Sequence, residues 1–384
     1  MSDYIHLFET QAAHDAVYNG SQYTEPWVGL VTANDSVSYN NPEYKLRSVP
    51  LTFEIISDGN IMWKHSLNTY TIEYKKNNGD WTSITSTTSG ATIPVVSGDV
   101  VQLRGNAQTY GATSGYTSFT GTTAGFNVSG NIMSLSDKTD FETCTTLIRG
   151  SERYSQYKFY HLFDNCTGLI DASKLLLPAT TLTASCYGYM FKGCTNLTAA
   201  PKLPATILTN KCYISMFEGC TSLTTAPELP ATTLAENCYY RMFYGCTSLT
   251  TAPELPATTL ANYCYGYMFR GCTNLITVPT ILPATTLANN CYEDMFQGCT
   301  SLTTAPELPA TTLVDRCYDS MFNNCSNLNY IKCLAMDISA SNCLSYWVIG
   351  VQTTSGTFVK NPNMLSWTTG TSGIPSGWTV QDAS

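Results

Sequence analysis

Sixteen cysteines are the residues of this 384-residue chain whose type and spacing could do chemistry. They fall mainly into two rows, one recurring every 26 residues with a single step of 27, the other following the first six members by eight residues. The first row is Cys186, Cys212, Cys238, Cys264, Cys291, Cys317 and Cys343, and the second is Cys194, Cys220, Cys246, Cys272, Cys299 and Cys325. Thiols in such rows could form disulfides, bind a metal or pack as small hydrophobes.

Spacing within one copy separates these alternatives. Cys238, Met242, Phe243 and Cys246 stand at i, i+4, i+5 and i+8, which predicts a short helical turn with cysteine and methionine on one face. Eight helical residues span about 12 Å, and a disulfide needs Cα atoms roughly 4.4 to 6.8 Å apart. We therefore expect buried free thiols. Disulfides between neighbouring repeats are the second alternative, and metal sites the third, because the regular repeats contain no C-x-x-C pair and no histidine.

Other residues with catalytic potential are sparse. The four histidines, His6, His14, His65 and His161, lie outside the regular repeats and have no nucleophile motif around them. Glu228, Glu254 and Glu307 share one repeat position, with Lys202 there in an earlier copy. Such a row could bind a cation, but separately hydrated glutamates are the commoner arrangement. The sequence predicts no enzyme, no catalytic residue, no metal and no cofactor.

Positions that change between the copies are better candidates for function. They are the two residues after each Cys-Tyr pair and the residue after each Phe. Because core positions of a stack must repeat, the changing positions should face solvent. The resulting candidate ligand-binding residues, which would form an aromatic and basic patch, are Tyr189, Tyr240, Arg241, Tyr244, Tyr267 and Arg270. Ordinary solvated surface remains the alternative interpretation.

These positions must be held by a repeating element. A fixed period of this length is typical of a solenoid, in which each unit stacks on the next. After the predicted helical turn, prolines such as Pro253 and Pro256 exclude a helix, and the Thr- and Leu-rich residues favour extended backbone. Each repeat is therefore expected to contain one short strand and one helical turn.

The flanking segments differ from the repeats. Between residues 47 and 138, alternating apolar runs separated by turn signals predict a β-sandwich. Its candidate core residues are Trp63, Ile72, Tyr74, Trp81, Val100 and Leu103. The expected organisation is a docking arm over 1–46, the sandwich over 47–138, the solenoid over 139–348 and a C-terminal cap over 349–384.

Composition excludes several classes of function. Only 12% of residues are charged and the net charge is −9, so the sequence lacks the basic patch that nucleic-acid binding requires. The N-terminus does not resemble a signal peptide, and no apolar stretch approaches the ~20 residues that span a bilayer. We expect neither nucleic-acid binding nor membrane insertion, and export by a route other than ordinary secretion.

The pattern F-x-G-C-T-S-L-T-x-x-P-x-L-P-x-T-x-L, as in Phe243–Leu260, resembles the BspA-like leucine-rich repeat family of bacterial and protist surface proteins. The resemblance covers about Cys144–Trp347, with a longer period and a strand segment richer in Thr and Pro than is usual. It implies a leucine-rich-repeat solenoid with short strands and helical turns. The strand number and spacing over 47–138 suit an immunoglobulin- or fibronectin-like sandwich, so the expected fold class is mixed β/α.

The ends of the chain carry a second resemblance. YIHLFETQAAHDAVYNG, PLTFEIISDGNI, IEYKKNNGDWTSI, GTFVK and GIPSGWTV are similar to modules of virion proteins from gut Bacteroidales phages, including crAss-like phages. This resemblance implies a non-enzymatic virion component, either a head fibre, a capsid decoration or a tail adhesin. Its N-terminal half would dock on other virion proteins, and its solenoid would bind a host-surface or mucosal glycan or protein.

The resemblance also allows a homo-oligomer. It implies a location in the virion, outside cells after lysis. The alternative hypothesis is a bacterial cell-surface adhesin that binds host protein or glycan.

Overall fold

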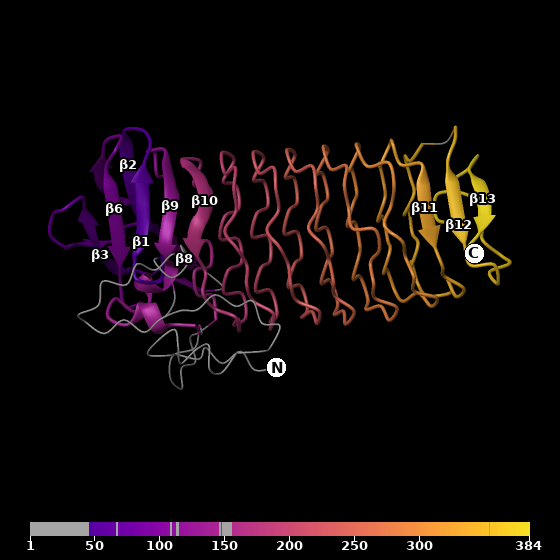
Figure 1. Ribbon diagram of the computed structural model, residues 1–384, viewed down its shortest axis with the longest axis horizontal. Helices are drawn as coiled ribbons and strands as arrows, with labels where there is room; N and C mark the ends of the chain where they lie inside the picture. Colours follow the sequence, from indigo (N-terminus) through magenta and orange to yellow (C-terminus); the bar gives the residue numbers. More distant parts are fainter. Residues whose placement is uncertain are drawn as a thin grey trace, which may run out of the picture.

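The computed structural model describes residues 46–66, 68–107, 110–112, 115–145, 147, 156–352 and 354–384. Figure 1 shows an elongated molecule, with an N-terminal β domain at one end, a row of stacked repeats in the middle and three C-terminal strands at the other end. The docking arm expected over 1–46 lies outside the described residues except for its last position. Within the described part of the chain, no helix is long and apolar enough to cross a membrane.

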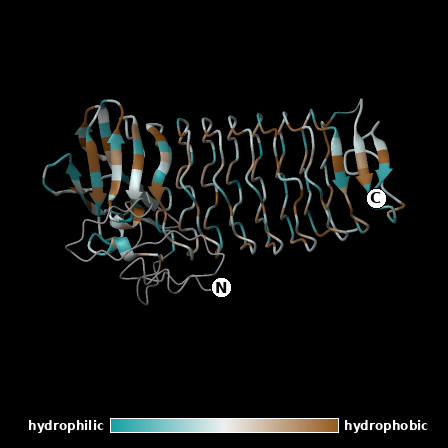
Figure 2. Cartoon of the chain, viewed as in Figure 1, coloured by the Kyte–Doolittle hydropathy of each residue, from teal (hydrophilic) through white to brown (hydrophobic). Residues whose placement is uncertain are grey.

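Two sheets form the N-terminal domain. The six-stranded sheet has the order β10 (Leu169–Leu176), β9 (Phe126–Asn131), β1 (Leu51–Ile55), β6 (Val100–Arg104), β3 (Thr71–Lys76) and β4 (Thr82–Thr85). The four-stranded sheet has the order β5 (Ala91–Val95), β2 (Gly59–His65), β8 (Gly115–Ser118) and β7 (Gly111–Ala112). Figure 2 shows hydrophobic and hydrophilic residues alternating along these strands, as half-buried strands require.

Most of the residues predicted for the core of this domain are buried or half-buried. Trp63, Ile72 and Leu103 are buried, whereas Tyr74 and Trp81 are half-buried. The prediction for Val100 is wrong, because this side chain is 39% exposed. Side chains alternate between the faces of a strand, so β6 directs Val101 and Leu103 into the core and Val100 outward.

Strand β10 joins the domain to the repeats. It pairs in parallel with β9, and its Asp171 forms a bridge with Ala199 of the next repeat. The Phe163 ring stacks on Phe119 of the domain at 5.6 Å between centroids and on Phe191 of the next repeat at 5.4 Å. Sheet and core therefore continue from the domain into the stack.

The fold-class prediction of a mixed β/α protein is wrong. No α-helix lies wholly within the described residues. The complete helices found there are two short 3-10 helices, η1 (Ile132–Leu135) and η2 (Phe141–Thr143). Where a helical turn was expected, successive amides alternate between two directions. The Lys192 N–H donates to Tyr189 O within the repeat at 3.1 Å, whereas the Tyr189 N–H donates to Ile214 O of the next repeat at 2.8 Å. An α-helix needs every amide bonded four residues back within its own segment, so the segment is a series of tight turns instead.

Rows of identical side chains fill the stack. The rings of Tyr239 and Tyr265 lie 5.8 Å apart, and those of Phe243 and Phe269 lie 5.6 Å apart, both nearly parallel. The same two ladders run through the regular repeats. All sixteen cysteines are free, and fifteen of them, all except Cys144, are buried. The predicted free thiols therefore agree with the structure, although the helical spacing from which they were argued does not exist.

Three parallel strands end the chain: β11 (Tyr330–Cys333), β12 (Thr357–Lys360) and β13 (Thr379–Asp382). Trp347 closes the core of the last repeat, with its indole Nε1 donating to Gly373 O at 2.8 Å and its ring stacked on Trp367 at 6.1 Å. The C-terminal residues thus cover the end of the repeat core with aromatic rings.

Candidate functional site

The series of turns presents the changing residues along one edge of the stack. Every fourth residue of a turn segment has a positive φ, for example 57° at Tyr189, 57° at Arg241 and 59° at Tyr267. Bulky side chains are rare in this left-handed region. One row of the same segment meets the requirement with glycine, as at Gly245 with φ 70°. Tyr189, Arg241 and Tyr267 therefore occupy a row of positions that the backbone disfavours for bulky side chains.

Five of the six predicted residues meet in two successive repeats. We call Tyr240, Arg241, Tyr244, Tyr267 and Arg270 the aromatic–guanidinium edge. The Arg241 guanidinium carbon lies 4.3 Å from the Tyr244 ring centroid, and that of Arg270 lies 5.8 Å from Tyr244 and 5.3 Å from Tyr267. The rings of Tyr240 and Tyr267 are 5.3 Å apart. All five side chains are half-buried, so they are held in place while part of each remains exposed.

Carboxylates neutralise the cations of this edge. Arg270 Nη1 lies 3.4 Å from Asp294 Oδ1, and Glu218 lies between Arg241 and Lys192, a residue outside the edge whose Nζ is 3.2 Å from Glu218 Oε1. Arg241 Nε lies 3.7 Å from Glu218 Oε2, and this buried nitrogen makes no hydrogen bond. Burial raises the pKa of Asp294, and the positive charge of Arg270 opposes that rise. The edge therefore offers rings and donors with little net charge.

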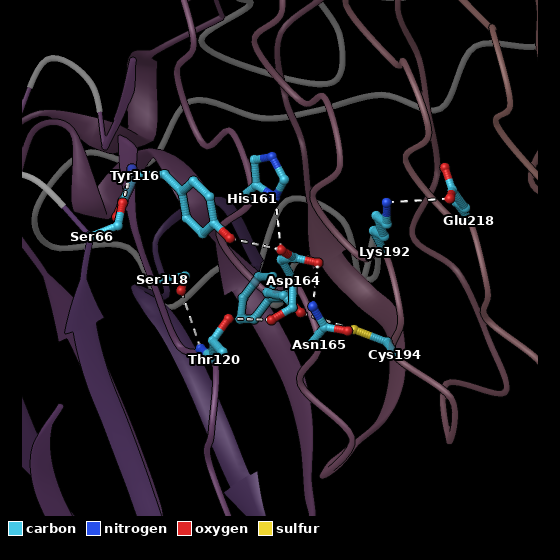
Figure 3. Close-up of polar contacts among 11 residues, drawn as sticks. Ser66, Tyr116, Ser118, Thr120, His161, Asp164, Asn165, Lys192, Cys194 and Glu218 are labelled. Carbon is cyan, nitrogen blue, oxygen red and sulfur yellow. Dashed lines mark hydrogen bonds and ion pairs between the residues drawn. The ribbon is translucent and has the colours of Figure 1, made fainter. Parts of the chain in front are cut away.

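Tyr189, the sixth predicted residue, belongs to a neighbouring cluster. Its ring stacks on His161 at 4.5 Å, and the other face of His161 stacks on Tyr116 at 4.0 Å. Figure 3 shows Tyr116 and His161 converging on Asp164, whose Oδ2 lies 3.1 Å from the Tyr116 hydroxyl and 2.8 Å from His161 Nδ1. Burial, with the nearby Asp164 charge, raises the pKa of Tyr116 to about 12.

Sequence reasoning missed this His161 cluster. Phe163 and Phe191 belong to one ladder, so His161 occupies the position that Tyr189 occupies in the next repeat. That register could have been read by aligning the degenerate first copy, YHLFDNC, with YGYMFKGC. Tyr116 comes from β8 of the N-terminal domain, and no sequence pattern links it to the repeats.

The glutamate row and the cysteines, the other groups with chemical potential, lie in surroundings that do not indicate a reactive site. Glu228 and Glu254 are exposed, and Glu307 pairs with Lys332, with Oε2 and Nζ 2.9 Å apart. In the described ranges no group of three or more His, Cys, Asp or Glu side chains could hold a metal ion. Burial raises the pKa of Cys272 to about 12, which keeps this thiol protonated and poorly nucleophilic at neutral pH. What the site can do is bind, by stacking and hydrogen bonding.

Comparison with known proteins assigns the repeats. Residues 241–346 match the BspA type leucine rich repeat region, in six copies. Among solved structures, the chain is similar to a leucine-rich repeat protein from Bacteroides ovatus ATCC 8483, with 14% identity and a TM-score of 0.27. That match covers 52% of this chain and 57% of the other, so the chain spans just over half of that protein's length. No curated protein matches the sequence. The stack over residues 241–346 is thus similar to BspA type leucine-rich repeats.

Proposed function

We propose that this chain is a non-enzymatic attachment protein, which binds a glycan or protein on a host-cell or mucosal surface through the aromatic–guanidinium edge. The observation that carries the proposal is the arrangement of Arg270, whose guanidinium carbon lies 5.8 and 5.3 Å from the ring centroids of Tyr244 and Tyr267. Tyrosine and arginine dominate the energetics of many binding surfaces. Because the stack already holds these side chains in fixed positions, less conformational entropy is lost when a ligand binds.

The charges of the edge favour particular ligands. Glu218 and Asp294 already lie close to the cations, so a purely anionic ligand would compete with existing ion pairs. A ligand that offers flat faces to the rings and hydroxyl or amide groups to the donors needs no such exchange. Surface glycans and polar protein loops both meet this description.

The test of binding is a triple variant, Tyr240→Ser, Arg241→Ser and Tyr244→Ser, of the full chain. Immobilised mucin and host-cell surfaces serve as probes, and circular dichroism checks the fold. We expect retention to fall at least about tenfold, the effect of losing about 1.4 kcal/mol of binding free energy. Trp81→Ser is the matched control, because Arg104 also stacks on that ring, at 3.9 Å, but in the N-terminal domain. Equal retention by the triple variant and by the control contradicts the proposal.

The wider setting that we propose is a phage virion, with the chain as a head fibre, capsid decoration or tail adhesin. Two features support it: segments at both ends of the chain resemble virion modules in sequence, and the N-terminal domain stands at one end of an elongated stack (Figure 1). The domain would then dock on other virion proteins while the repeats project. Mass spectrometry of gradient-purified particles should find the chain at a fixed ratio to the capsid protein. Its recovery only in the bacterial surface fraction would replace the virion with the cell-surface adhesin.

A further inference from the structure

One repeat differs from the others by a single extra residue. The nine residues LITVPTILP at 275–283 stand where the preceding copy has the eight residues LTTAPELP at 249–256. This insertion accounts for the 27-residue step in the cysteine row. It lies in the segment of threonines and prolines, not in the turn segment that carries the aromatic–guanidinium edge.

The insertion interrupts the ladder between repeats. Parallel bridges join Thr225 to Thr251 and Thr251 to Thr277, and the row continues from Thr304 to Tyr330. Among the described residues no bridge joins Thr277 to Thr304. Pairing resumes after the insertion, where the Glu307 N–H donates to Thr280 O at 2.9 Å and the Leu282 N–H donates to Glu307 O at 3.0 Å. Residues 278 and 279 therefore stand outside the ladder with the next repeat and form a bulge.

A cavity of about 440 Å³, widely open to solvent, lies at this interruption. Val278 and Pro279 of the bulge form an apolar wall, and Tyr330 of β11 also lines the cavity. Ile276, which also lines the cavity, is 59% exposed at its rim. The volume falls within the range of pockets that hold small organic ligands.

The polar groups of the cavity are arranged for hydroxyl-rich ligands. Four threonines line it, and their hydroxyls both donate and accept hydrogen bonds. They are Thr277, Thr280, Thr303 and Thr304. At one side Glu307 Oε2 and Lys332 Nζ lie 2.9 Å apart, each side chain 29% exposed. This pair supplies an acceptor and a donor whose charges cancel.

We infer that this cavity, which we call the insertion pocket, is a second binding site and takes an uncharged mono- or disaccharide. A charged ligand would have to break the Glu307–Lys332 pair or be desolvated without a counter-charge. A neutral sugar donates hydroxyls to the carboxylate and accepts from the ammonium while the pair stays intact. Its apolar face packs on Tyr330 and the bulge.

Saturation-transfer NMR on the full chain tests this inference. The probes are methyl glycosides of glucose, galactose, mannose, fucose and N-acetylglucosamine at millimolar concentration, beside glucuronic acid and sialic acid. We expect transfer to at least one neutral sugar and at least tenfold less to the acids. Replacing residues 275–283 by LTTAPELP restores the regular period and should abolish the signal. This replacement introduces only a sequence that the stack already contains three times, at 223–230, 249–256 and 302–309.

Point variants separate the pocket from the rest of the surface. Glu307→Gln should weaken the signal at least fivefold, whereas Glu228→Gln, an exposed glutamate at the same repeat position, should leave it unchanged. The triple variant of the aromatic–guanidinium edge should also retain full transfer, so the two sites can fail separately. The inference is overturned by no transfer to any neutral sugar, by stronger transfer to the acids, or by full transfer to the chain with the regularised repeat.

Discussion

The thiol of Cys246 donates a hydrogen bond to the main-chain oxygen of Phe217 in the preceding repeat, over 3.1 Å. The same relationship joins Cys220 to Phe191 at 3.0 Å and Cys272 to Phe243 at 3.1 Å. Cysteine at this position is therefore both a small apolar filler and a donor. The same oxygen already accepts from a main-chain amide, as Phe217 O does from the Cys220 N–H at 3.0 Å, so the thiol is a second donor to a buried carbonyl.

Cys246→Ala tests this relationship. The alanine removes one of the two donors to the Phe217 oxygen, leaves the Cys220 N–H in place and adds a small void, so the free energy of unfolding should fall by about 1–2 kcal/mol. Urea denaturation followed by circular dichroism measures the change. Cys144→Ala, at the half-exposed cysteine, should change stability by no more than about 0.5 kcal/mol. Equal effects of the two variants would show that the thiol hydrogen bond contributes nothing.

Thiol reactivity should report burial directly. At pH 8, iodoacetamide should modify Cys144 in the native protein well before the fifteen buried cysteines. In urea all sixteen should react. Mass spectrometry after a timed quench counts the adducts. Rapid modification of several repeat cysteines without denaturant would mean that the stack opens readily.

Alkaline pH should destabilise the fold. Burial raises the pKa of Cys264 and of Cys272 to about 12, from an ordinary value near 9. Above pH 9 the unfolded chain loses these protons while the folded chain keeps them, so the stabilisation present below pH 9 is progressively lost up to about pH 12. The urea concentration at the unfolding midpoint should therefore decrease as the pH is raised from 8.5 to 10.5. A midpoint that is flat or rising over this interval contradicts the expectation.

Two tyrosines should respond in opposite ways to loss of the hydroxyl. The Tyr239 hydroxyl is buried without a hydrogen-bond partner, so Tyr239→Phe should leave stability unchanged or raise it by up to about 1 kcal/mol. The buried Tyr110 hydroxyl donates to Leu135 O at 2.5 Å, and Tyr110→Phe should cost about 0.5–1.5 kcal/mol. Thermal and urea denaturation of both variants provide the comparison. A loss at Tyr239 as large as that at Tyr110 would indicate an internal partner, such as an ordered water molecule.

Backbone strain gives a further prediction. Lys211 is exposed and has a φ of 59°, so Lys211→Gly should raise the free energy of unfolding by about 0.5–1 kcal/mol. Lys174→Gly, at an exposed position within β10, should lower it by a similar amount. Denaturation curves of the two variants should therefore shift in opposite directions. Shifts in the same direction would remove the case for strain in the turn segments.

The sequence predicted the stack better than it predicted the backbone within one repeat. Equal spacing of the cysteines depends only on the units being alike, and the structure has them in register. The helical interpretation failed because the Tyr189 amide bonds to Ile214 of the next copy, and spacing inside a single copy cannot indicate such a bond. The prediction also placed both Val100 and Leu103 in the core, although residues three apart on a strand point to opposite faces, and Val101 is the buried neighbour.

The sequence indicated which residues belong to the candidate site, but not which of them are in contact or what they pair with. Variation between copies identified the five residues of the aromatic–guanidinium edge, because only non-core positions are free to change. Their carboxylate partners were not identified, since Glu218 and Asp294 belong to the same changing rows and gave no separate signal. The cavity beside Tyr330 depends on a missing bridge, which becomes visible only when neighbouring repeats are placed side by side.

Hydrogen bonds from alternate amides, such as that from Phe243 N to Met268 O at 2.9 Å, connect each repeat to the next. Because they act between successive units, tension applied at the two ends loads these contacts in series, and the units should detach one after another. Each 26-residue unit would release about 90 Å of chain when it extends fully. The stack should thus yield to a sudden load by lengthening in steps, and not in a single unfolding event.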